Sequence, residues 1–167
     1  LRLAFPPSFA HYGAVPMLSQ FQAENADITI HLETPKIFGD LNKVNVDLAV
    51  IYSAPQVTEN VMDLLWQEDV TPLCHPDLVA GINMDNPQAF LATQEPVHIK
   101  VIDEAHQTWD NWLRAHGMNF RTHAGSVFDT AHLAGQYVMM GRGVFLSDPK
   151  LFEQEIAAGQ LIAPFPN

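Results

Sequence analysis

The stretch that most constrains the fold is residues 128–146, FDTAHLAGQYVMMGRGVFL. Its apolar residues recur at helical spacing and then give way to β-forming residues, which predicts a helix followed by a strand. Gly141 and Gly143 lie between the two, where a helix exit requires a positive φ angle or close backbone approach. Either Asp129 or Thr130 can cap the helix, because both side chains accept hydrogen bonds from first-turn amides. The stretch therefore predicts a surface helix that leads into a buried strand.

The first part of the chain alternates strand and helix patterns. We expect strands at residues 1–5, 27–33 and 46–52, with helices at 8–25 and 37–43 between them. Residues 27–33 alternate between apolar and polar, whereas residues 46–52 are almost wholly apolar, which is typical of a strand buried on both faces. Pro16 either kinks the first helix or marks a second helix start. This order predicts a parallel sheet with right-handed crossovers.

Strand and helix patterns continue through the rest of the chain and predict a second α/β lobe inserted into the first. Strand patterns occur at residues 61–66, 70–74, 97–102 and 120–124, and helix patterns at 86–93, 108–117 and 149–158. The helix at 108–117 carries an apolar stripe of Trp109, Trp112 and Leu113. We expect lobe I to comprise residues 1–73 plus 147–167, with residues 161–163 added to it, and lobe II to be residues 74–146. The chain would then cross between the lobes twice, near 70–74 and 144–146, and two crossing strands form a hinge.

The charge balance and the apolar pattern exclude several classes of protein. Asp and Glu number 19 against 8 Lys and Arg, and this net charge of -11 opposes binding of nucleic acid by the chain itself. We find no membrane span or secretion signal and expect a cytoplasmic protein. The chain begins inside a strand-like run without Met, which suggests a domain of a longer protein. The single cysteine, Cys74, is either a redox sensor or an inert buried thiol.

Candidate binding residues follow the predicted strands. In α/β proteins, ligands bind beyond the carboxyl ends of the strands, near free helix amides. Ser8 and Thr130 could instead serve only as helix caps, and Lys100 could be a solvated surface lysine. The expected contacts in lobe I are Pro7, Ser8, Phe9, Thr34, Pro35, Tyr52 and Ser53, and those in lobe II are Lys100, Val127, Phe128, Asp129 and Thr130.

The sequence does not indicate catalytic or metal chemistry. Ser8 and His11 lie three residues apart on one helix, which provides no orienting carboxylate or oxyanion hole, so we predict no catalytic residue. The eight histidines lack metal-ligand spacing, and we predict no metal and no cofactor. Some histidines could titrate near neutrality and make the domain sensitive to pH. The three tryptophans are expected in a core or a subunit interface.

Several motifs together resemble one protein family. They are residues 128–131, 141–146 and 158–165 near the C-terminus, and residues 7–10, 15–21, 27–32, 46–49 and 75–78 earlier in the chain. In this order and spacing they resemble the effector domain of LysR-type transcriptional regulators, nearest the glycine-cleavage-activator-like branch. The chain has Ile51, Tyr52 and Ser53 where many members of this branch have Arg, Tyr and Gly.

The resemblance implies a periplasmic-binding-protein-like fold of type 2, with a cleft between two lobes for a small-molecule effector. It also implies an N-terminal winged helix-turn-helix that is absent from this chain and through which alone the protein would bind DNA. Family members commonly pair effector domains side by side and form tetramers, so a homo-oligomer is expected, with no membrane partner. The predicted function is therefore that of a regulatory sensor and not of an enzyme. The alternative is a solute-binding protein of an uptake system with the same fold.

Overall fold

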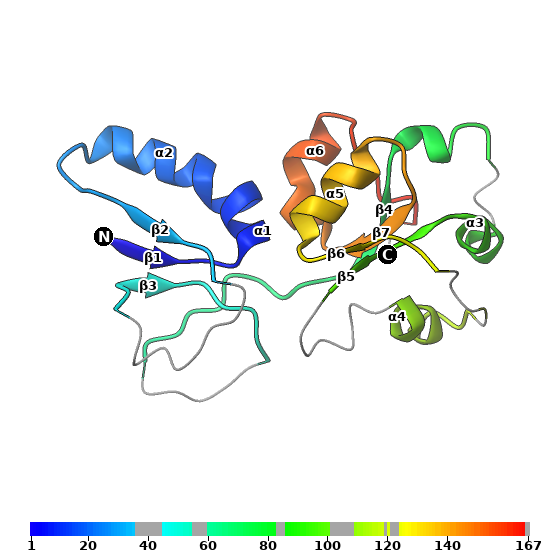
Figure 1. The fold of residues 1–167 in the computed structure, drawn as a ribbon, viewed down its shortest axis with the longest axis horizontal. Helices are drawn as coiled ribbons and strands as arrows, with labels where there is room; N and C mark the ends of the chain where they lie inside the picture. The colour runs from blue at the N-terminus through cyan, green and yellow to red at the C-terminus, as the bar shows by residue number, and fades with distance from the viewer. Residues whose placement is uncertain are drawn as a thin grey trace. The chain divides into compact units, whose positions relative to one another are not determined.

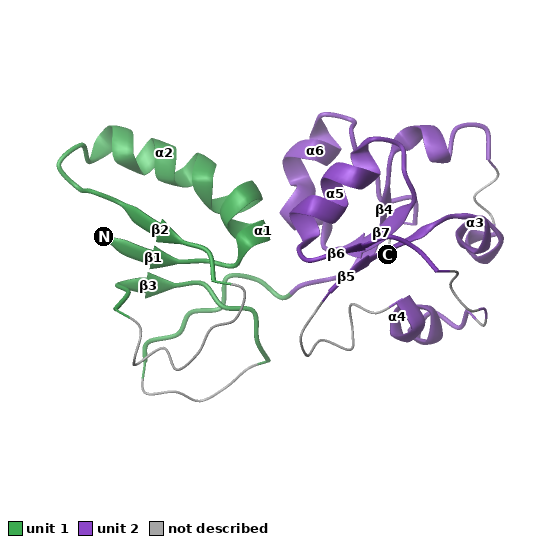
Figure 2. Cartoon of the chain, viewed as in Figure 1, with its two compact units in different colours: residues 1–67 green, residues 68–167 purple. Residues whose placement is uncertain are grey.

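Each half of the chain carries its own β-sheet. The computed structural model describes residues 1–35, 45–54, 60–82, 86–100, 109–118, 120 and 124–165. By its internal contacts the chain divides into unit 1 (Leu1–Gln67) and unit 2 (Glu68–Asn167), which Figure 2 shows in green and purple. The sheet of unit 1 has the strand order β2-β1-β3 and that of unit 2 has the order β4-β7-β5-β6. Both units combine strands with helices, in agreement with the predicted α/β class (Figure 1).

Unit 1 is a parallel sheet covered by one long helical segment. Its elements are β1 (Arg2–Ala4), α1 (Pro7–Phe9), the π-helical turn η1 (Ala10–Ala14), α2 (Val15–Glu24), β2 (His31–Glu33) and β3 (Leu48–Ala49). Leu3 in the central strand lies opposite Leu32 on one side and Leu48 on the other. Side chains from Ile28 to Glu33 alternate between half-buried and exposed, which confirms the predicted alternation. Leu3, Phe5, Ala10 and Ala14 form a small core cluster in the unit.

The helical segment changes its winding before Pro16. The Val15 N–H donates to the Ala10 carbonyl five residues earlier, so this turn is wider than an α-helical turn. Pro16 has no N–H and is tolerated in the first turn of α2, which begins at Val15. Of the two predicted roles of Pro16, the structure shows the second helix start.

Two predictions in unit 1 are wrong. Residues 46–52 are not buried on both faces: only Leu48–Ala49 pairs as β3, and Leu48 is 50% exposed. The reason is that β3 lies at the end of the described strand order, where neighbours cover it less. Residues 61–66 form no strand, and Val61 and Leu64 are 93% and 84% exposed. Apolar composition alone does not supply a partner strand.

Unit 2 has a mixed sheet with helices on both sides. Its elements are β4 (Thr71–Cys74), the 3₁₀ turn η3 (Pro76–Leu78), α3 (Pro87–Thr93), β5 (Pro96–Ile99), α4 (Trp109–Ala115), β6 (Val127–Phe128), α5 (Ala131–Met139), β7 (Val144–Ser147), the 3₁₀ turn η5 (Pro149–Phe152) and α6 (Glu153–Ala157). β4 pairs antiparallel with β7, and β5 pairs parallel with both β6 and β7. In Figure 1, α5 and α6 lie on one side of this sheet and α4 lies on the other.

Two helices of unit 2, α4 and α5, bury the apolar faces that the sequence predicted. The predicted stripe of α4 is buried, and the indole N–H groups of Trp109 and Trp112 donate to the Val97 carbonyl at 3.2 Å and the Val70 carbonyl at 2.9 Å. Val138 in α5 is fully buried, and α5 packs on β5 and β7. All residues of β4 and β7 are buried.

The turn between α5 and β7 also follows the prediction. Gly141 and Gly143 have φ angles of 79° and 65°. A Cβ atom at Gly143 would lie 2.6 Å from the Glu95 carbonyl oxygen, so this position requires glycine for close approach as well as for its backbone angle. The turn thereby brings β7 next to β5.

The C-terminal segment packs within unit 2. Ile162 forms an antiparallel bridge with Cys74, and residues 161–163, which we expected to add to lobe I, fall in unit 2 by their contacts. Residues 147–167 fall in unit 2 by their contacts, whereas the predicted lobe I comprises residues 1–73 plus 147–167. Those lobes are defined by crossover strands and not by contacts, and their boundaries stay a prediction. The two predicted crossover segments, β4 and β7, are paired antiparallel.

Some predicted elements lie outside the described residues. These are the helix at 37–43, most of the strand at 120–124 and the end of the strand at 97–102. Of the helices that the structure describes, none combines the length and hydropathy needed to cross a membrane.

Candidate functional site

In unit 1, most of the predicted site residues follow the carboxyl ends of three parallel strands. Pro7 and Ser8 come after β1, Thr34 and Pro35 after β2, and Tyr52 and Ser53 after β3. Backbone hydrogen bonds tie these ends together, since the Phe5 N–H donates to the Glu33 carbonyl and the Val50 N–H to the Ala4 carbonyl, both at 3.0 Å. The carboxyl ends of parallel strands lie at one edge of a sheet. The structure therefore brings these six residues to the same edge of unit 1.

Ser8 does not cap the first helix, contrary to one of its two predicted roles. The cap position is Pro6, which has no side-chain cap hydrogen bond, and Ser8 lies inside α1 between Pro7 and Phe9. The helix begins at Pro7, one residue before Ser8, because the fixed φ angle of proline suits the first positions of a helix. The half-buried Ser8 side chain is thus placed in the first turn, near the strand edge.

Phe9 belongs to the core of unit 1 and not to its edge. Its ring packs edge-on against Phe5 with the centroids 5.4 Å apart, and it lies 5.8 Å from the ring of Trp66. A Cβ atom added at Gly13 would lie 3.1 Å from this ring, so the π-helical turn also presents its smallest residue to Phe9. We conclude that Phe9 supports the turn that carries Ser8.

In unit 2, the predicted residues follow β5 and β6. The Lys100 N–H donates to the Phe128 carbonyl at 2.7 Å, which places the two strand ends side by side. Lys100 and Asp129 are exposed, and Val127 is 63% exposed. The Phe128 ring packs against Tyr137 of α5, with ring centroids 5.1 Å apart. This edge therefore combines a cation, an acid and apolar surface.

Thr130 has an unusual environment at the start of α5. It occupies the cap position of the helix, as predicted, but its side chain makes no cap hydrogen bond. Its Oγ1 atom is buried and has no hydrogen-bond partner among the described residues. A buried hydroxyl without a partner lowers stability, because it has given up its hydrogen bonds to water. Its predicted role as a cap is wrong, and its hydroxyl is available to a ligand that reaches it.

A carboxylate that the sequence analysis missed lies beneath the same helix. Glu95, just before β5, accepts hydrogen bonds through Oε1 from the Ser126 hydroxyl at 2.7 Å and the Ser126 N–H at 3.1 Å. The Tyr137 hydroxyl donates to Glu95 Oε2 at 3.4 Å. The Ser126 hydroxyl bond, the Ser126 N–H, Tyr137 and the charge of Arg142 together lower the pKa of the Glu95 carboxyl, although burial opposes them. No local pattern links these residues, which lie 31 and 42 positions apart.

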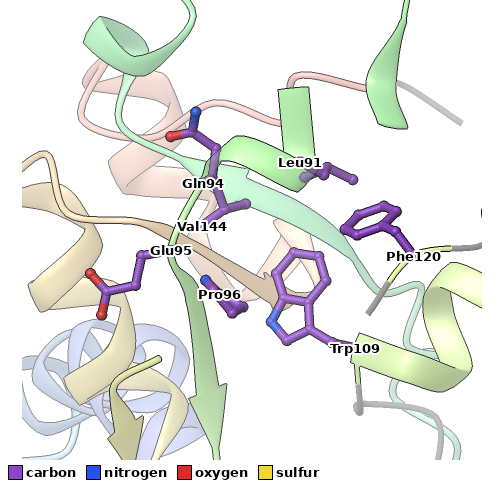
Figure 3. Close-up of a pocket in the computed structure, with 7 residues that line it drawn as sticks. All are labelled: Leu91, Gln94, Glu95, Pro96, Trp109, Phe120 and Val144. Atoms are coloured by element: carbon purple, nitrogen blue, oxygen red, sulfur yellow. The ribbon is translucent and has the colours of Figure 1, made fainter. Parts of the chain in front are cut away.

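Two hollows in the described part of unit 2 do not coincide with the predicted residues. One pocket, whose lining residues include Glu95, Trp109 and Val144 (Figure 3), has a volume of about 10 Å³. This volume has room for about one water molecule. An open depression of about 360 Å³ is lined by Glu68, Val70, Asn111, Trp112 and Ala115. Neither contains a residue of the predicted site.

The described residues offer little for metal or redox chemistry. Among them, no group of three or more His, Cys, Asp or Glu residues is arranged to hold a metal ion. Cys74 is fully buried, and burial raises the pKa of its thiol to about 12. Its thiolate is the reactive form and is therefore scarce at neutral pH, which agrees with the inert alternative of the sequence analysis.

Comparison with known proteins gives a consistent result. A family described as "LysR substrate binding domain" matches residues 1–167. The chain is 30% identical over 167 residues to the HTH-type transcriptional regulator PerR of Escherichia coli K12, covering 100% of this chain and 54% of that protein. It is 28% identical over 168 residues to the glycine cleavage system transcriptional activator of the same strain, covering 99% and 53%. The chain thus spans about half the length of the curated relatives it matches.

Solved structures show the same fold. The effector domain of the transcriptional regulator AmpR of Pseudomonas aeruginosa has a TM-score of 0.78 at 23% identity, over 100% of this chain and 79% of that one. CrgA of Neisseria meningitidis, a LysR-type transcriptional regulator, has a TM-score of 0.76 at 17% identity, over 97% and 54%. The predicted periplasmic-binding-protein-like fold class is confirmed.

Proposed function

The chain belongs to the LysR substrate-binding domain family, and from this premise we propose that it is the effector-binding regulatory part of a DNA-binding transcriptional regulator. Its matched relatives are named as transcriptional regulators and are about twice as long. DNA contact would belong to the part of the protein outside this chain, which the net charge of -11 supports because a phosphate backbone repels it. The protein would then act in the cytoplasm.

We propose that the effector is a small molecule bound at the strand ends of both units. Unit 1 would contribute Pro7, Ser8, Thr34, Pro35, Tyr52 and Ser53, and unit 2 would contribute Lys100, Val127, Phe128, Asp129 and Thr130. The observation that supports this most directly is the buried Thr130 Oγ1, which has no hydrogen-bond partner among the described residues and lies at the start of α5. Phe9 would act indirectly, by supporting the turn that holds Ser8.

The effector would regulate by preferring one arrangement of the protein over another. Binding shifts such an equilibrium only through unequal affinity for the two arrangements. We propose that the shift reaches the DNA-binding part through contacts between paired effector domains in a homo-oligomer. A transport function has less support, because the relatives reported above are named as transcriptional regulators. No catalytic step is required by this function.

A thermal-shift screen of small metabolites tests the proposal. A bound metabolite should raise the melting temperature in proportion to the logarithm of its excess over the dissociation constant. Thr130→Val keeps the side-chain shape but removes the hydroxyl. This variant should melt at the same temperature as the parent or higher, because no hydrogen bond is lost, and should lose most of the shift produced by the metabolite.

The matched control is Thr93→Val in α3. The Thr93 hydroxyl donates to the Phe90 carbonyl at 2.8 Å, so this variant should lose about 1 kcal/mol of stability and keep the full metabolite-induced shift. Ser8→Ala should weaken the shift from the side of unit 1. An undiminished shift in both Ser8→Ala and Thr130→Val would contradict the proposed site.

A further inference from the structure

Tyr137 of α5 contacts two different parts of unit 2 with the two ends of its side chain. Its ring packs against the Phe128 ring at the end of β6, with the centroids 5.1 Å apart and the planes inclined at 44°. Its hydroxyl donates to Glu95 Oε2 at 3.4 Å and lies 3.4 Å from the Ser126 hydroxyl. All four residues are half-buried. One side chain therefore links a polar cluster to a residue of the proposed effector site.

The backbone of β6 explains how one side chain reaches both. The His98 N–H donates to the Ser126 carbonyl at 2.8 Å. The Lys100 N–H donates to the Phe128 carbonyl at 2.7 Å, so both carbonyls point toward β5. Side chains two positions apart on a strand lie on the same face of the sheet. Ser126 and Phe128 thus share one face, and Tyr137 covers both from α5, which packs on β5, β6 and β7.

The Glu95 end of this link is fixed by its neighbours. The Val144 N–H donates to the Glu95 carbonyl at 2.9 Å, and a Cβ atom at Gly143 would lie 2.6 Å from the same carbonyl oxygen. The Ser126 hydroxyl and N–H hold Glu95 Oε1 at 2.7 and 3.1 Å. The Tyr137 hydroxyl therefore meets an acceptor whose main chain and other carboxylate oxygen are already held in place.

Packing of α5 on the sheet does not require the Tyr137 hydroxyl. Ala134 and Val138 are fully buried on the inner side of the helix. A phenylalanine at position 137 would offer Phe128 the same ring. The hydroxyl adds a directional bond, which restricts the tilt of the Tyr137 ring and with it the positions open to the Phe128 ring. The polar cluster therefore has a role beyond attaching the helix.

We infer that Tyr137 is a positioning residue, which holds the Phe128 ring in one orientation because its own hydroxyl is tied to Glu95 and Ser126. As a determinant of effector binding this rests on the proposed function, in which Phe128 contacts the effector and Tyr137 acts only through Phe128. Without the hydroxyl, the ring of residue 137 stays in place but tilts more freely, and the Phe128 ring follows it. The orientation of Phe128 can be measured without any effector.

Fluorine NMR tests the orientation of the Phe128 ring. A 4-fluorophenylalanine placed at position 128 alone gives a single fluorine signal, whose chemical shift depends on how this ring lies against Tyr137. Tyr137→Phe removes only the hydroxyl and should shift the signal or split it into two, because the ring then samples more than one orientation. The matched control is Thr93→Val, which removes another hydrogen-bonded hydroxyl of unit 2 and should leave the signal unchanged.

Two substitutions at Glu95 test the anchor. Glu95→Ala removes the acceptor and should change the fluorine signal as Tyr137→Phe does. Glu95→Gln should preserve the parent signal, because its carbonyl oxygen can accept from Ser126 while its NH₂ group donates to the Tyr137 oxygen. A loss of stability alone would not give this pattern, since the signal is recorded on folded protein.

Calorimetric titration tests the consequence for binding. The probe is the metabolite that gives the largest rise in melting temperature of the parent in the thermal-shift screen. Tyr137→Phe should weaken its affinity about fivefold, the equivalent of one hydrogen bond. Phe128→Leu should weaken the affinity at least as much, and adding Tyr137→Phe to Phe128→Leu should have no further effect, because Tyr137 acts through that ring.

An unchanged fluorine signal in Tyr137→Phe overturns the inference, and so does the same change in Thr93→Val or an additive loss of affinity in the double variant. If Tyr137→Phe fails to fold, Glu95→Ala carries the test. Unfolding of both overturns the inference, because the cluster would then be needed for the fold itself. A screen in which no metabolite binds counts against the proposed function, whereas the fluorine signal still decides whether Tyr137 positions Phe128.

Discussion

Unit 1 and unit 2 bury their sheets to different extents. In unit 2 both β4 and β7 are buried along their whole length, and Phe145, Phe152 and Leu161 are completely inaccessible to solvent. In unit 1 no residue of β2 or β3 is fully buried, and the main core cluster among the described residues, Leu3, Phe5, Ala10 and Ala14, is packed against half-buried neighbours. Since apolar burial is the main source of stability, unit 2 should fold firmly whereas unit 1 should open more easily. The difference indicates that core substitutions should cost more stability in unit 2 than in unit 1.

The largest expected effect comes from removing one ring in unit 2. Phe145→Ala deletes a fully buried side chain that packs edge-on against Phe152 with ring centroids 5.1 Å apart, and should cost about 3–5 kcal/mol of unfolding free energy. Leu32→Ala in unit 1 removes a half-buried side chain and should cost about half as much or less. Urea unfolding followed by residue-resolved hydrogen exchange measures both. Equal costs would remove the contrast between the units.

A matched pair of glycine substitutions sharpens the contrast. A Cβ atom at Gly125 would overlap the Pro96 carbonyl oxygen of unit 2, which is backbone and cannot rotate away. At Gly13 of unit 1 the new atom would meet only the edge of the Phe9 ring at 3.1 Å. Gly125→Ala should therefore cost about 3 kcal/mol, whereas Gly13→Ala should stay within about 1 kcal/mol of the parent, since alanine favours helix.

Thermal unfolding of the two glycine variants checks this pair. The expected order is the parent and Gly13→Ala close together, with Gly125→Ala melting at a much lower temperature. A Gly13→Ala variant as unstable as Gly125→Ala would mean that the core of unit 1 is as rigid as that of unit 2.

The smallest expected effect is a dependence of the stability of unit 2 on pH. The pKa of the Glu95 carboxyl is lower in the folded protein than its ordinary value, so the folded state releases this proton more readily than the unfolded chain. The resulting stabilisation is present above the unfolded pKa of about 4.3 and is lost as the pH falls through the lower folded pKa. Lowering the pH should therefore reduce the stability of unit 2 and, with it, the difference in stability between the units.

Variants of the Glu95 cluster isolate this effect. Glu95→Gln should remove the corresponding slope from a plot of unfolding free energy against pH below about 4.3. Ser126→Ala should reduce the slope, because the Ser126 hydroxyl makes the hydrogen bond that lowers the pKa of Glu95 most. If the unfolding free energy of the parent protein does not change with pH in this range, the stabilising role given to the Glu95 carboxylate is wrong.

The sequence predicted best where a local pattern was strong. The stripe of α4 and the glycines after α5 were identified correctly because helical spacing and positive φ angles are properties of a few neighbouring residues. The predicted site residues came from the rule that ligands bind beyond strand ends, and the structure brings those of unit 1 to one edge, except Phe9. Ligand contact by any of them stays a prediction.

The sequence by itself determined the family, the α/β class and the positions of most helices and strands, because these follow from composition, periodicity and motif order. Only the tertiary structure decided that Leu48 of β3 is exposed, that the Thr130 hydroxyl has no hydrogen-bond partner among the described residues, and that Glu95 and Asp148 each join distant segments. Burial and side-chain partners depend on which elements become neighbours in space. Contacts that span 31 to 79 positions leave no mark in local periodicity.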